Sequence, residues 1–211
     1  MCLSPEASFA AAGVLAPVGV ATLRSVRSRD QLIIASLPLL FALHQLSEGF
    51  VWLGVRGEVS AGLEHTAIRF YLLFAQVVLP VLVPLGMLLL EPDRARKRWL
   101  LGLVLVGCAV SLRLLWVVTA HPVGADDLDR AITYDTDVLF GAWVGAGYIA
   151  ATCGPLLLST LRHLRWFGVA NLVGLGAAVL IRYSAVTSIW CAYAALVSVL
   201  ILLHFRRFST A

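Results

Sequence analysis

Three side chains that can exchange protons or stabilise a cation lie at helical spacing in one apolar segment. His44, Glu48 and Trp52 follow one another at intervals of four residues, so on a helix they share one face. A carboxyl buried away from water is favoured in its neutral form, and a neutral carboxyl beside aromatic rings is the arrangement that general-acid catalysis needs. The spacing therefore indicates Glu48 as a proton donor and His44 as the group that hydrogen-bonds to it or resupplies its proton.

The same residues also allow structural interpretations. Glu48 could form an ion pair with Arg69 or Arg113 that fixes helix packing, because a charge inside a membrane is costly unless it is paired or hydrated. His44 could be a packing histidine whose hydrogen bonds are satisfied. Both alternatives place the residues inside the protein but give them no chemistry.

A second acidic residue, Asp137, opens a later apolar segment. It could form a salt bridge to Arg113 or Arg182, or it could be a second catalytic carboxylate that orients or tunes the acid. Aromatic rings level with Glu48 could stabilise a developing cation. The residues that we expect to line the substrate site are Trp52, Arg69, Gln76, Arg113, Trp116, Tyr183 and Trp190.

Membrane helices must position these residues, because the composition excludes a water-soluble globule. Apolar and aromatic residues make up 60 % of the 211 positions, and charged residues make up 13 %, against about 25 % in soluble domains. A bilayer-spanning helix needs about 20 apolar residues. Seven runs qualify: about 5–23, 32–54, 66–90, 99–119, 137–160, 166–184 and 186–204. The sequence predicts an all-α polytopic membrane protein, a seven-helix bundle that forms a single domain over residues 1–211.

The basic residues predict how this bundle is oriented. Most of them follow the first, third, fifth and seventh runs, whereas the opposite connectors are acidic. By the positive-inside rule, the N-terminus lies outside and the C-terminus inside, in the inner (plasma) membrane of a cell. The charged residues within the runs then all lie in the outer half of the membrane: Glu48, Arg69, Arg113, Asp137 and Arg182. We expect one polar cavity there, opening toward the outer leaflet or the outer surface.

Several other function classes fit the sequence less well. Lys97 is the one lysine and lies in a connector, which excludes a retinal Schiff base in a helix. A zinc site of converging histidines is not favoured, and His44, Glu48 and His65 are a weak alternative for a metal, so neither a metal nor a cofactor is predicted. Ser188 has no base near it in the sequence, which leaves a serine nucleophile unsupported. The net charge of +4 reflects topology-setting arginines rather than a nucleic-acid surface.

Several motifs resemble those of a bacterial family of small seven-span membrane proteins of unassigned function. The chain opens Met-Cys-Leu-Ser-Pro-Glu-Ala-Ser-Phe over residues 1–9, where that family reads Met-Cys-Phe-Ser-x-x-Ala-Ser-Phe. The resemblance continues through residues 45–52, 74–80 and 189–191 and spans nearly the whole chain. Leu3 stands where phenylalanine is usual.

The size, the number of spans and the embedded acid also resemble the integral-membrane terpene cyclases of actinobacterial and fungal meroterpenoid pathways. This resemblance implies that Glu48 protonates a prenyl chain or its epoxide. The late aspartate of the fungal type has no counterpart in the last run, which leaves Asp137 as a substitute. The predicted function is cyclisation of a lipophilic prenylated substrate, with membrane lipid as the surrounding partner. The alternative is a non-enzymatic protein that binds a lipid or small ligand, or that couples transport to protons, and a purely structural role is a third.

Overall fold

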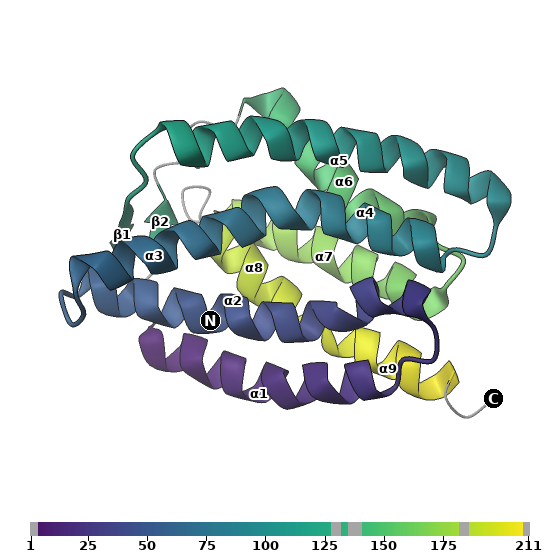
Figure 1. Cartoon of the computed structure of the whole chain (residues 1–211), viewed down its shortest axis with the longest axis horizontal. Helices are drawn as coiled ribbons and strands as arrows, with labels where there is room; N and C mark the ends of the chain where they lie inside the picture. Colours follow the sequence, from purple (N-terminus) through teal and green to yellow (C-terminus); the bar gives the residue numbers. More distant parts are fainter. Residues whose placement is uncertain (1–3, 128–131, 135–140, 182–185, 209–211) are drawn as a thin grey trace.

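The computed structural model describes residues 4–127, 132–134, 141–181 and 186–208, and these form an all-α bundle with one short hairpin (Figure 1). The helices are α1 (Pro5–Arg24), α2 (Leu32–Val55), α3 (Ala61–Leu72), α4 (Leu79–Leu90), α5 (Arg94–Ala120), α6 (Ala142–Leu158), α7 (Arg162–Ile181), α8 (Val186–Val197) and α9 (Val199–Phe208). The antiparallel strands β1 (Ala125–Asp127) and β2 (Ile132–Tyr134) pair with Ala125 opposite Tyr134.

Six helical segments are long and apolar enough to cross a membrane. They are Pro5–Arg24, Arg29–Val55, Ala61–Leu90, Arg94–Ala120, Arg162–Leu180 and Ser188–Arg206. The predicted span at about 137–160 corresponds to the shorter apolar helix α6. An all-α protein with several membrane-length helices is therefore confirmed, while the seventh span and the orientation remain predictions.

Helix α2 lies at the centre of the bundle. Its apolar window is 61 % buried, compared with 28 % in α1 and 33 % in α5. Gly19 lets α1 approach it closely, since a Cβ there would come 2.5 Å from the backbone nitrogen of Leu39. Polar side chains on the inward face of α2 are consequently inside the protein rather than against lipid.

A wide π-helical turn, Leu73–Val78, joins α3 to α4 just before Pro80. Proline has no N–H to donate to the preceding turn, so carbonyls there need other partners. Tyr148 Oη of α6 donates to the Ala75 carbonyl at 2.5 Å, and Ser111 Oγ of α5 donates to the Val77 carbonyl at 2.6 Å. The π-helical turn between α3 and α4 is thus fixed by hydrogen bonds from two neighbouring helices, α5 and α6.

The two ends of the bundle differ in charge and carry exposed tryptophans. The α1–α2, α4–α5 and α6–α7 connectors, which are rich in arginine, lie at one end, and the hairpin lies at the other (Figure 1). Trp99 and Trp166 are exposed near the basic end, and Trp116 and Trp143 are exposed toward the hairpin end. Trp99 and Trp116 are separated by about 26 Å along α5 at 1.5 Å per residue. Tryptophans at both interfaces of a hydrocarbon layer about 30 Å thick are typical of membrane proteins.

Candidate functional site

The carboxyl of Glu48 lies in the interior of the bundle, between α2 and α8. Its side chain is fully buried, and Oε1 accepts a hydrogen bond of 2.5 Å from Ser188 Oγ. Ser188 is fully buried as well, although 140 positions separate the two residues in the sequence. The predicted burial of Glu48 is confirmed. Its partner is Ser188, the serine that has no base near it in the sequence.

His44 lies one helical turn before Glu48 and is held by aromatic rings. Its ring stacks on Tyr71 at a centroid distance of 4.0 Å and an angle of 20°, and it lies against Phe74 at 5.0 Å. The stack continues from Tyr71 to Tyr134 of β2 at 4.7 Å. Neither ring nitrogen of His44 has a hydrogen-bond partner among the described residues, so the expected hydrogen bond to Glu48 is absent from that part of the chain.

The hairpin covers this aromatic stack from the end opposite to the basic connectors. Ile132 and Tyr134 are 0 % and 2 % exposed, and they belong to one apolar cluster with Val51, Trp52 and Tyr71. The indole Nε1 of Trp52 has no hydrogen-bond partner within the described ranges. The described part of the hairpin therefore packs against the site at the end where an opening to the outer surface was predicted.

The two arginines that were expected to pair with Glu48 lie on the outside of the bundle. Arg69 and Arg113 are both exposed, and neither forms an ion pair with Glu48. The Arg113 guanidinium lies 4.8 Å from the centroid of Trp116, whose side chain is also exposed. The alternative in which Arg69 or Arg113 pairs with Glu48 is therefore wrong, because both side chains point away from the interior, and Trp116 shares that outward position.

The remaining predicted site residues fall into two groups. Gln76 is 1 % exposed and lies in the π-helical turn, and its predicted role in substrate binding remains a prediction. Asp137, Arg182 and Tyr183 lie outside the described residues, and their predicted roles remain predictions.

A small apolar cavity of about 40 Å³ lies between α2, α4, α6, α7 and α8. Its wall includes Phe41 from α2, Tyr148 and Cys153 from α6, and Trp190 and Cys191 from α8. Trp190 lines this cavity, while its predicted role in a substrate site with Glu48 remains a prediction. Glu48 does not belong to this wall, so the buried acid and the cavity occupy different stretches of the inward face of α2.

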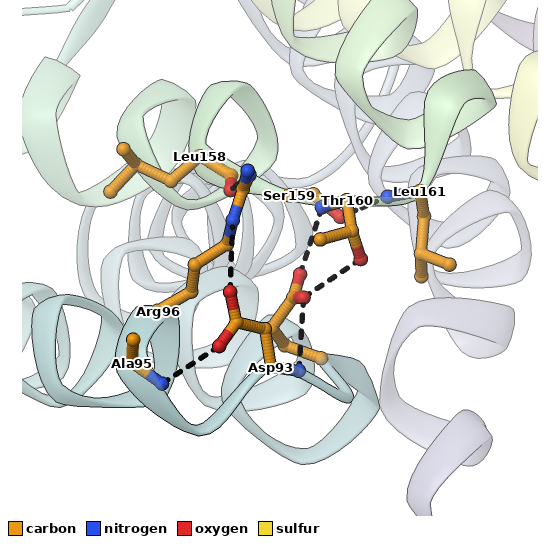
Figure 2. A network of polar contacts seen from close by, with 8 residues as sticks. Asp93, Ala95, Arg96, Leu158, Ser159, Thr160 and Leu161 are labelled. Carbon is orange, nitrogen blue, oxygen red and sulfur yellow. Dashed lines mark hydrogen bonds and ion pairs between the residues drawn. The ribbon is translucent and has the colours of Figure 1, made fainter.

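A second buried acid, which the sequence analysis missed, lies at the basic end. Glu91 is 1 % exposed and accepts hydrogen bonds from Thr160 N at 3.0 Å, Thr160 Oγ1 at 2.8 Å and Asp93 N at 3.3 Å. Arg96 bridges Asp93 and the Leu158 carbonyl in the same network (Figure 2). These contacts join the α4–α5 connector to the α6–α7 connector. An acid directly before Pro92, among basic residues, is the signal that could have indicated this network.

Comparison with known proteins gives a family but no activity. The whole chain, residues 1–211, matches a protein family described as "Family of unknown function (DUF6629)". No curated protein and no solved structure matches it. These comparisons do not connect the chain with terpene cyclases.

Proposed function

Since the chain belongs to the DUF6629 family over its whole length, and that family has no assigned function, we propose a function from the residues themselves. We propose an integral-membrane enzyme in which Glu48 protonates a lipophilic prenylated substrate, or its epoxide, and starts its cyclisation. The observation that carries this proposal is that Glu48 is fully buried on the central helix and accepts a hydrogen bond from the neutral hydroxyl of Ser188.

The surroundings of Glu48 support the role of a general acid. Glu48 is enclosed between α2 and α8, away from solvent, and an enclosed carboxyl suits the transfer of a proton to a bound substrate. The hydrogen bond from Ser188 fixes the carboxyl orientation. The stacked rings of His44, Tyr71 and Phe74 lie one helical turn away and give this part of the interior an aromatic wall.

The proposed reaction starts and ends at the same carboxyl. The proton of Glu48 passes to one carbon of a trisubstituted alkene, the π electrons form the new C–H bond, and the neighbouring carbon becomes a tertiary cation. A second double bond of the chain attacks that cation and closes a ring. Loss of a proton to the Glu48 carboxylate restores the acid, so the net reaction is an isomerisation. The apolar cluster around Trp52 excludes water that would quench the cation.

The proposed location is the plasma membrane, with the N-terminus outside and the C-terminus inside. The arginine-rich connectors gathered at one end of the bundle support this orientation. The substrate would then enter from the bilayer, because the hairpin covers the opposite end of the site.

A second candidate function is non-enzymatic binding of a lipid or small apolar ligand. The observation that favours it is the separate apolar cavity, whose wall does not include Glu48. Under this proposal the buried acid adjusts binding or its pH response, and no product forms.

The two candidates are distinguished by product analysis with the full chain in membranes. A farnesylated phenol and its terminal epoxide are incubated with the parent, with Glu48→Gln and with Glu58→Gln, which makes the same chemical change at an exposed position. We expect a cyclised isomer from the parent and the control, and a loss of about a hundredfold or more in Glu48→Gln, since general acids contribute about 10²–10⁴. Product formation by Glu48→Gln at the parent rate would overturn the mechanism. Ligand binding without product in the parent would support the second candidate.

A further inference from the structure

The cavity between α2, α4, α6, α7 and α8 has polar side chains in its wall that donate to backbone carbonyls. Tyr148 Oη donates to the Ala75 carbonyl, and Thr152 Oγ1 donates to the Tyr148 carbonyl at 2.8 Å. Asn171 Nδ2 donates to the Phe167 carbonyl at 2.8 Å. Each of these donors is satisfied by the protein backbone, so the wall gains little from a polar occupant.

The same holds on the α8 side of the cavity. Trp190 Nε1 donates to the Asn171 carbonyl at 3.0 Å, and the Trp190 side chain forms part of the cavity wall. Cys153 and Cys191 are 2 % and 5 % exposed, and buried thiols behave as small apolar groups. An apolar cavity of this kind stays dry and takes apolar molecules.

The size of the cavity limits what enters it. Since a water-sized probe sphere takes about 10–15 Å³, the cavity of about 40 Å³ holds about three such spheres. That corresponds to a compact group of a few carbon atoms rather than to a whole lipid chain. Phe41, Leu79 and Leu156 line it from three different helices.

We infer that this cavity binds the branched hydrocarbon end of a membrane-soluble ligand, such as the last unit of an isoprenoid chain or an iso-branched acyl chain. Phe41 precedes Glu48 by two turns on the same face of α2, about 10 Å along the helix axis. Under the proposed function, on which this assignment rests, the cavity is the subsite for the end of the prenyl chain. The binding itself does not require chemistry at Glu48.

The test is saturable photolabelling of the full chain in lipid nanodiscs. The probe is a short branched alcohol that carries an aliphatic diazirine, and labelled residues are located by mass spectrometry. Prenol, isoamyl alcohol and linear pentanol compete separately, so that the isoprenoid, saturated branched and unbranched classes are distinguished. Cys191→Met and Ala194→Val each fill the cavity from α8, and Ala150→Val is the matched control because Ala150 is exposed on α6.

We expect labels on cavity residues of α6 and α8, with stronger competition by the two branched alcohols than by pentanol. Each filling variant should lower this labelling by about tenfold, which corresponds to about 1.4 kcal/mol of lost binding. Ala150→Val should retain it. Labelling that is confined to lipid-facing residues, or that survives both filling variants, would overturn the inference. If the parent is labelled in the cavity but forms no cyclised product, the cavity is a binding site and the proposed cyclase function is wrong.

Discussion

The chain contains two buried glutamates, and their surroundings differ in kind. Glu91 lies where α4 ends and accepts hydrogen bonds from connector groups of Thr160 and Asp93. Glu48 lies in the middle of α2 and accepts its hydrogen bond from Ser188 of another membrane-length helix. A buried acid that gathers backbone N–H groups at helix ends stabilises the connections between helices. Glu48 instead lies between two long helices, away from the connectors, which is why we propose chemistry for Glu48 and a structural role for Glu91.

The largest expected effect on stability concerns the Glu91 network. Glu91→Ala removes a carboxylate that accepts hydrogen bonds from both connectors, and hydrogen bonds to charged groups contribute about 1.5–3 kcal/mol each. We expect the free energy of unfolding to fall by about 3 kcal/mol, measured by denaturant titration in detergent micelles. Glu58→Ala, which removes an exposed acid, serves as the control. If the two variants had the same free energy of unfolding, Glu91 would not stabilise the connectors, and the contrast between Glu91 and Glu48 would fail.

The packing of α5 on α4 is expected to depend on close backbone contact instead. Gly107 of α5 lies directly against α4, since a Cβ there would come 1.9 Å from the Pro80 carbonyl oxygen. Gly107→Ala should lower the free energy of unfolding by about 2 kcal/mol, the usual cost of overpacking. Gly102→Ala on the same helix is the matched control, because a Cβ there meets nothing within 4 Å. Equal stability of the two variants would show that α4 and α5 can separate at no cost.

The positions of the helices could largely be predicted from hydropathy, but their starts could not. The predicted run at about 66–90 corresponds to a helical segment that begins at Ala61, because Ser60 caps it and its first turns are polar. The predicted run at about 99–119 begins at Arg94, where Asp93 accepts a hydrogen bond from Ala95 N. Hydropathy overlooks such turns, since basic and polar residues form helix without adding apolar character.

For the candidate site, burial could be predicted and partners could not. The spacing of His44 and Glu48 correctly placed both residues in the interior. Their contacts come from distant segments: Ser188 from α8, and Tyr134 from a connector that looks acidic and external in the sequence. A single sequence contains no signal for such long-range pairs, because helix-to-helix register depends on side chains from both partners.

The smallest expected effect on stability, and the sharpest test of the contrast between the two glutamates, is at His44. His44→Phe keeps an aromatic ring against Tyr71 and Phe74 but removes two buried nitrogens that have no hydrogen-bond partner among the described residues. A buried polar atom without a partner costs about 1–3 kcal/mol, so its removal offsets any loss of packing. We expect the free energy of unfolding to stay within about 0.5 kcal/mol of the parent or to rise, in the same titration that detects the loss in Glu91→Ala. Tyr71→Ala, which removes the stacking partner, should by contrast lower it by about 3 kcal/mol. Unchanged stability of His44→Phe would show that aromatic packing, rather than polar contacts, holds this ring. A strong destabilisation by His44→Phe would instead mean that polar partners hold this ring, and the region around Glu48 would then join the basic end as a structural network.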